Sequence, residues 1–237
     1  MAAADGTISR VSVGEMLAAE AGTTCDRARL QALSVHRLTA VRAAVARNPH
    51  ASRALLVELA RDRHHLVRYA VAQNRGPFAE QVALGAADRS VRVILAQRRD
   101  LDASTYESLV VDSAHEVREA VVASSRSPDL VVRLAADPHP GVRSVVAHHD
   151  LCPDELIDVL SRDRDARVRG SVASTRRLSE EMIARLLVDR SAAVRWNLLT
   201  HHPGRRDIAE ALAADPDELT AVQARHQLAP GPQIGSA

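Results

Sequence analysis

Seven Val-Arg dipeptides carry the residues best suited to chemistry, because a guanidinium presents several donors to a phosphate or carboxylate. They begin at Val41, Val67, Val91, Val117, Val142, Val168 and Val194. An Asp stands five positions before most of them, and the predicted ladder comprises Asp62, Arg68, Asp112, Arg118, Asp137, Arg143, Asp163, Arg169, Asp189 and Arg195. Such arginines could track a phosphate backbone. We favour a structural role, because each Asp falls at a turn where it can cap a helix and pair with an Arg of its own or the adjacent repeat.

Three histidine pairs raise the question of a metal site: His64 with His65, His148 with His149, and His201 with His202. Packed helices lie about 8 to 10 Å apart, which would place His149 and His201, two repeats apart, roughly 20 Å from each other. Metal ligands lie about 2 Å from the ion they share. We therefore predict neither a metal nor any other cofactor.

The residue types also argue against catalysis. All 31 basic residues are arginine, so the chain has no lysine for a P-loop or a Schiff base. Cys25 and Cys152 are too few for a disulfide framework, and the repeat register separates them by on the order of 50 Å. Cys152 at a helix N-cap could have a lowered pKa, but no base or oxyanion site accompanies it. We predict that the protein is not an enzyme.

The Val-Arg pairs recur at intervals of 26, 24, 26, 25, 26 and 26 residues. An aliphatic residue follows four positions after each Val, and a small or aliphatic one five positions after it, which indicates one apolar face of a three-turn helix. A second helical pattern precedes each pair, as in SRALLVELARD and CPDELIDVLSRD. Ser127 before Pro128, and Ser104 with Glu107, are start signals for such helices. Each repeat is thus predicted to be a helical hairpin.

Two short helices cannot bury their apolar faces alone, so the hairpins must stack around a shared core. This predicts an all-α solenoid of about seven repeats of 24 to 26 residues. We expect a single domain over residues 1–228, with a cap over about 1–27, including a helix near Val11 to Ala21, and repeats over about 28–228. Residues 229–237, APGPQIGSA, are predicted to be a flexible tail.

The string VRxAVAxNP followed by LLxxLAxD closely resembles the leucine-rich repeat variant family and, more distantly, HEAT-like repeats. The resemblance covers residues 28–228 and implies a right-handed superhelix with the Val-Arg helices lining one face. A known member of the family carries a cysteine-ligated iron–sulfur module before its repeats. This chain lacks the cysteine cluster, so we expect no such group. In function, the resemblance implies binding to a macromolecule and no substrate.

Recognition is expected at positions that differ between repeats, namely the residue two after each Val and the polar segment after each helix end. The predicted contact residues are Arg47, Asn48, Tyr69, Asn74, Arg75, Arg98, Arg99, His148, His149, Arg176, Arg177, Trp196, His201 and His202. Tyr, Trp and Arg are frequent hot spots in protein interfaces. The alternative is that Asn48 and Asn74 cap helix C-termini and the other polar residues form solvated surface.

These patterns favour a cytoplasmic, non-catalytic scaffold that binds a protein partner, without a signal peptide or a membrane span. The alternative is a nucleic-acid binder or a DNA-repair protein, because residues 1–100 hold 15 arginines against 9 acidic residues. Residues 101–237 reverse this balance, with 16 arginines against 21 acidic residues, and aromatic residues for base stacking are scarce.

Overall fold

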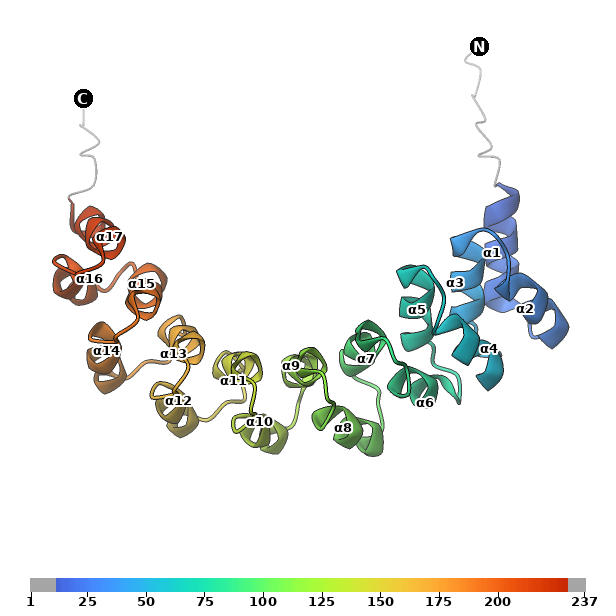
Figure 1. Cartoon of the computed structure of the whole chain (residues 1–237), viewed down its shortest axis with the longest axis horizontal. Coiled ribbons are helices and arrows are strands. Elements are labelled where there is room, and N and C mark those ends of the chain that lie inside the picture. The colour runs from blue at the N-terminus through green and yellow to red at the C-terminus, as the bar shows by residue number, and fades with distance from the viewer. Residues whose placement is uncertain (1–11, 230–237) are drawn as a thin grey trace, which may run out of the picture. The chain divides into compact units, whose positions relative to one another are not determined.

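The computed structural model describes residues 12–229. Within that range the secondary structure consists of seventeen α-helices with no strand (Figure 1), so the predicted all-α repeat solenoid is confirmed. Packing divides the chain into two compact units, the first ending at Ser124 and the second beginning at Ser125. Residues 230–237 of the predicted tail at 229–237, and residues 1–11 of the predicted cap, lie outside the described residues. The hypothesis of one continuous domain stays a prediction.

Within each unit the helices form two rows, one of odd-numbered and one of even-numbered helices (Figure 1). The odd-numbered row of the first unit contains α1 (Val13–Thr23), α3 (Thr39–Arg47), α5 (His65–Ala72), α7 (Arg89–Ala96) and α9 (His115–Ser124). That of the second unit contains α11 (Pro140–Ala147), α13 (Ala166–Ala173), α15 (Ala192–His201) and α17 (Glu218–Leu228). The Val-Arg pairs all lie in this row.

The even-numbered row contains the helices that precede the Val-Arg pairs. In the first unit they are α2 (Arg27–Ser34), α4 (Arg53–Leu59), α6 (Ala79–Leu84) and α8 (Ala103–Val110). In the second unit they are α10 (Pro128–Leu134), α12 (Asp154–Leu160), α14 (Glu180–Leu187) and α16 (Arg206–Leu212). Each is α-helical although it has only two turns, because its apolar face packs on the following odd-numbered helix.

Small aliphatic side chains fill the space between the two rows. In α5, for example, Val67, Val71 and Ala72 are completely buried. The residues at the same register positions in α3 and α15 are equally buried, as are those of α7 and α13. Because these side chains are short, neighbouring helices can approach closely, and the repeats bury a common core that no single hairpin could form.

The structure confirms one of the predicted helix starts and corrects two others. Ser127 caps α10 by accepting a hydrogen bond from the Leu130 amide, with Pro128 in the first turn, as predicted. The prediction for Ser104 was wrong, because Asp102 caps α8 and accepts from the Thr105 amide. The N-cap of α12 is Pro153 rather than Cys152. In both cases a neighbouring residue occupies the extended position that a cap requires.

The repeat between Val67 and Val91 is two residues shorter than its neighbours. Its even-numbered helix, α6, has six residues and is the shortest of the described helices. The shortening also moves the acidic residue of the turn, so that Asp88 stands three positions before Val91 and caps α7. Residues of this shortened repeat line the surface between α4 and α6.

The ends of the described chain continue the two rows. The predicted cap helix is α1, which packs on α3 in the odd-numbered row. At the other end α16 and α17 form a hairpin that lacks the Val-Arg pair. Thr220 takes the register position of the Val and is completely buried.

Candidate partner-binding surface

The Val-Arg arginines join successive repeats through paired hydrogen bonds to aspartates. Arg143 donates from Nε to Asp163 Oδ2 at 2.7 Å and from Nη2 to Asp163 Oδ1 at 2.8 Å. The same two-bond pairing joins Arg42 to Asp62, Arg92 to Asp112, Arg169 to Asp189 and Arg195 to Asp215. Each pair spans 20 residues, so the aspartate belongs to the following repeat.

The same arginines also hold the turn of their own repeat. Arg143 donates from Nη1 to the backbone oxygen of Asp137 at 2.7 Å, and Arg118 donates likewise to Asp112. The aspartate side chain completes the turn by accepting from the amide two residues later, as Asp137 does from His139. Each Arg therefore contacts the turn backbone of its own repeat and, in the five two-bond pairs, the carboxylate of the next. We call this set of contacts the Arg–Asp ladder.

Electrostatics in the ladder favour the charged forms. In Asp215 the hydrogen bond from Arg195 lowers the pKa, and it outweighs the opposing effect of burial. In Asp163 burial is the largest influence and raises the pKa, but hydrogen bonds from Arg143 and the Asp165 amide together bring it below its ordinary value. The arginines of these pairs have raised pKa values for the same reason. The ladder is thus an internal network of ion pairs rather than a free row of positive charge.

A second set of contacts joins the repeats at the other end of the odd-numbered helices. Asn74 donates from Nδ2 to the backbone oxygens of Ala46 and Asn48, at 2.7 and 2.8 Å. Asn48 makes the equivalent bonds to Ala21 and Thr24, both at 2.9 Å. Carbonyl groups at a helix C-terminus have no partner within the helix, and these side chains supply one. We call this set the Asn ladder.

Asn48 and Asn74 are therefore buried structural residues in this conformation, and a partner cannot contact their side chains. Arg98 takes the corresponding position one repeat later. It donates from Nη1 to the Asn74 oxygen at 2.8 Å and pairs with Glu80 and Asp100. The place of Asn48, Asn74 and Arg98 in the polar segment after a helix end predicted surface contacts, but their side chains instead bond to backbone oxygens of the preceding repeat.

The remaining predicted contact residues of the first unit lie at the surface. Arg47 and Arg99 are exposed, and the half-buried Tyr69 accepts a hydrogen bond at its hydroxyl from Gln73. Arg75 is exposed and lies 3.5 Å from Asp100, so the structure brings Arg75 and Arg98 together on one carboxylate. Much of the charge in this cluster is neutralised locally.

In the second unit, four predicted residues line one hollow of about 260 Å³: His148, His149, Arg176 and Arg177. His148 Nε2 lies 2.9 Å from Ser174 Oγ, and Arg177 pairs with Asp154. Three histidines of the other two pairs contact the backbone of their own or the preceding repeat. His64 caps α5, His201 Nδ1 lies 2.9 Å from the Asn197 oxygen, and His202 Nε2 lies 3.0 Å from that of Ala173.

An apolar cluster on α15 and α17 was only partly predicted. Trp196 is 37% exposed, and Leu219 and Val222 are 72% and 50% exposed. The repeat interval of 26 residues places Val222 at the register position of Trp196 and Leu219 at that of Ala193. The two helices are in contact, so these side chains share one face of the second unit. Continuing the register past Val194 would have identified Leu219 and Val222, although the loss of Val-Arg obscures it.

Cys152 differs from the expectation of a lowered pKa. Its side chain is buried, and burial raises the pKa of its thiol. Arg177 lowers the pKa of the thiol, but this influence is smaller than that of burial. The expectation of a lowered pKa was therefore wrong, because the side chain is buried instead of exposed to solvent at a helix start.

The comparisons with known proteins agree with this architecture. The family described as "Leucine rich repeat variant" matches residues 39–64, which span α3 and α4. A matching solved structure is described as a leucine-rich repeat variant with a novel repetitive protein structural motif. It is 26% identical to this chain with a TM-score of 0.60, and the match covers 92% of this chain and 88% of that one. No curated protein matches the chain.

Within residues 12–229, no helix combines the length and hydrophobicity that a bilayer crossing requires. The repeat match, the structural match and the stacked hairpins lead to one conclusion. The chain is an all-helical repeat protein in which one repeat matches the leucine-rich repeat variant model, and its fold is similar to that of a solved leucine-rich repeat variant.

Proposed function

We propose that this protein is a non-catalytic scaffold that binds another protein through the odd-numbered row of its second unit. The observation that carries the proposal is the exposed apolar cluster of Trp196, Leu219 and Val222 on neighbouring helices. Contiguous apolar surface of this kind is uncommon on a soluble protein and often marks a binding site. Tryptophan is also among the residues that contribute most to protein interfaces.

The assignment of the polar residues supports the same proposal. The arginines that recur in every repeat, and both buried asparagines, are engaged in the Arg–Asp and Asn ladders. They hold the repeats together, which leaves the variable positions to distinguish partners. Repeat proteins bind in this way, because stacking presents one surface position per repeat in a regular row.

The nucleic-acid alternative has less support. It is based on the excess of arginine in residues 1–100, with Arg47, Arg75, Arg98 and Arg99 near repeat ends. Of these, Arg98 is only 11% exposed and contacts two carboxylates. Arg75 shares one of those carboxylates. Charge that is neutralised by neighbouring acids contributes little to the release of counterions from a phosphate backbone.

The test uses the full chain as bait and compares Trp196→Ala with Val188→Ala. Val188 is 81% exposed but lies at the end of α14, outside the cluster, so it controls for loss of exposed apolar area. We expect the first variant to lose a captured partner and the second to retain it, with both folded by circular dichroism. Trp196 is the single tryptophan of the chain, so its fluorescence should shift to the blue when the purified partner is added.

A parallel anisotropy titration against duplex and single-stranded DNA at two salt concentrations tests the nucleic-acid alternative. Binding that weakens steeply with salt and is lost in an Arg75→Glu, Arg99→Glu double variant would support nucleic-acid binding. Equal capture of the protein partner by the Trp196→Ala and wild-type chains would refute the proposed surface.

A further inference from the structure

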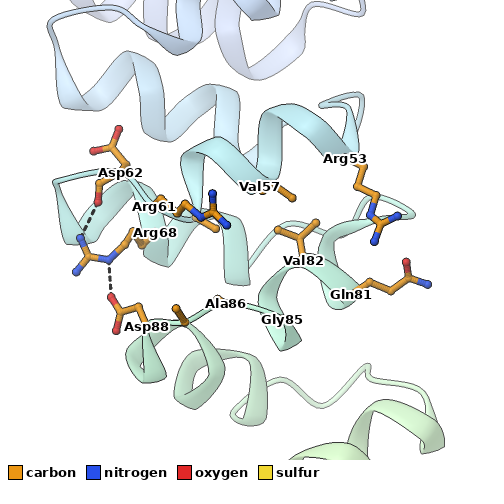
Figure 2. A pocket seen from close by; sticks show the side chains of 12 residues that line it. Arg53, Val57, Arg61, Asp62, Arg68, Gln81, Val82, Gly85, Ala86 and Asp88 are labelled. Atoms are coloured by element: carbon orange, nitrogen blue, oxygen red, sulfur yellow. Dashed lines mark hydrogen bonds and ion pairs between the residues drawn. The ribbon is translucent and has the colours of Figure 1, made fainter.

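A groove between α4 and α6 has features that neither ladder explains. It is a cavity of about 480 Å³, within the range of pockets that take small ligands or short peptide segments. Figure 2 shows Arg53 and Gln81 at one end, Arg61 and Arg68 at the other, and Val57 with Val82 between them. We refer to it as the α4–α6 groove. It lies in the first unit, whereas the Trp196 cluster lies in the second.

The shortened repeat opens one end of the groove. Arg68 donates a single hydrogen bond to its aspartate, from Nε to Asp88 Oδ2 at 2.5 Å, whereas the arginines of the five two-bond pairs each donate two. The side chains of this pair are 22% and 31% exposed, against 7% and 10% for Arg143 and Asp163. Among the described residues, Arg68 Nη2 makes no hydrogen bond, so one donor of this guanidinium is unsatisfied at that end of the groove.

The groove also has excess positive charge. Its two acidic residues are already engaged, Asp62 with Arg42 and Asp88 with Arg68. Arg53 and Arg61 make no ion pair or hydrogen bond through their side chains with any other residue in 12–229. Two guanidinium groups therefore flank a short apolar floor without a counter-charge from the described chain.

The second unit shows that this charge excess is not a general property of the repeat. The corresponding surface between α12 and α14 is lined by Arg162, Arg185 and Val188, among others. There Arg162 and Arg185 pair with Asp158, at 2.8 and 3.0 Å. Asp158 occupies the register position that Val57 has in the first unit. An acid thus neutralises the arginines of the second unit, and the first unit has a valine instead.

We propose that the α4–α6 groove binds an extended acidic peptide segment of a protein partner, with the order acid, any residue, apolar, any residue, acid. Arg53, Val57 and Arg61 are four residues apart on α4 and its C-terminal turn, so the two arginines are separated by about 12 Å. In an extended peptide, alternate side chains share a face, and the first and fifth residues lie about 13 Å apart. The two acids would reach Arg53 and Arg61, and the middle side chain would contact Val57 and Val82.

This inference does not depend on the proposed role of Trp196. The test titrates the full chain with a fluorescently labelled peptide that contains Glu-Thr-Leu-Thr-Glu. Matched peptides contain Gln-Thr-Leu-Thr-Gln, which removes the charges, or Glu-Glu-Leu-Thr-Thr, which keeps the charges but changes their spacing. We expect binding of the first peptide, and binding at least about tenfold weaker for the other two, because both ion pairs are then not formed together.

The decisive variant is Val57→Asp, which copies the arrangement of the second unit. The new carboxylate would stand one turn from both Arg53 and Arg61 and would neutralise them. Val57→Asn has nearly the same shape without the charge, and is expected to reduce affinity by less than about threefold. Arg37→Glu, an exposed change outside the groove, controls for net charge. The Arg61→Gln variant gives an independent measurement if Val57→Asp lowers stability.

We expect Val57→Asp and Arg61→Gln to weaken peptide binding by about tenfold or more, while Arg37→Glu leaves it within about twofold. Equal binding of the three peptides, or equal effects of Val57→Asp and Arg37→Glu, would show general charge attraction and overturn the proposal. Inorganic phosphate that binds the groove in the absence of any peptide binding would overturn it as well, in favour of a phosphate site.

Discussion

Arg169 and Asp189 form a bidentate pair, with Nε donating to Oδ2 at 2.6 Å and Nη2 to Oδ1 at 2.8 Å. The two residues belong to successive repeats, and both side chains are 8% exposed. Because Arg169 Nη1 also donates to the backbone oxygen of Asp163 at 2.8 Å, one guanidinium determines the position of two turns. Lysine could not make this set of contacts, since it lacks the planar fork of donors.

Removal of one partner from a ladder pair should destabilise the protein strongly. Asp163→Ala leaves Arg143 charged and largely buried, and we expect the free energy of unfolding to fall by about 3 kcal/mol. Glu210→Ala removes the exposed pair with Arg206 and should change it by less than about 0.5 kcal/mol. Urea denaturation followed by circular dichroism measures both. Equal effects of the two substitutions would contradict a structural role for the ladder.

The ladder should make stability depend on pH in the acidic range. Asp62, Asp112, Asp163, Asp189 and Asp215 all have pKa values below the ordinary value, so the folded state binds protons more weakly than the unfolded state. Their contribution is therefore complete above the unfolded pKa of about 3.9 and is lost as pH falls through the lower folded values. Thermal melts between pH 7 and pH 2 should show a Tm that declines below about pH 4. A Tm that stays constant to pH 2 would exclude this linkage.

Asn74 should contribute to stability through the carbonyls that it satisfies. Asn74→Ala leaves the oxygens of Ala46 and Asn48 without this donor in a buried environment, and should lower the free energy of unfolding by about 2 kcal/mol. Gln73→Ala, at the neighbouring exposed position, is the matched control and should have little effect. Chemical denaturation measures the difference. If the two variants are equally stable, the Asn ladder is not a significant stabilising contact.

Gly76 should not tolerate a side chain. A Cβ at this position would lie 2.7 Å from the backbone oxygen of Pro49 and 2.9 Å from Asn74 Oδ1, so the turn after α5 would have to move. Gly22 has no atom within 4 Å of such a Cβ and lies in α1. We expect Gly76→Ala to lower Tm and Gly22→Ala to leave it unchanged or raise it slightly, since alanine favours the helix. The reverse order would contradict the close packing at Gly76.

The two cysteines should react at different rates with a thiol reagent. Cys25 is exposed and Cys152 is buried with a raised pKa. Under native conditions we expect one thiol per chain to react quickly with a chromogenic disulfide, and the second to react only as the chain unfolds. Cys25→Ser should remove the fast phase. A fast phase that persists in this variant would show that Cys152 is accessible.

Trp196 and Asn74 show which part of the candidate surface could be predicted from the sequence. Trp196 was identified because the residue two positions after each Val varies between repeats, and it does lie at the surface. Asn74 was selected by the same kind of argument but is buried. Trp196 and Asn74 differ because the neighbouring repeat packs against them differently. The position of a residue within its own repeat does not reveal this packing.

The amino-acid sequence by itself determined the helical hairpins, their register and the residue types of the Arg–Asp ladder. These features depend on local periodicity and on residues a few positions apart, which act within a single helix or turn. Only the tertiary structure decided that Arg143 pairs with Asp163 of the next repeat, that Cys152 is buried, and that the shortened repeat around Asp88 opens the α4–α6 groove. Those contacts join residues 20 or more positions apart, and the stacking of one hairpin on the next sets their geometry.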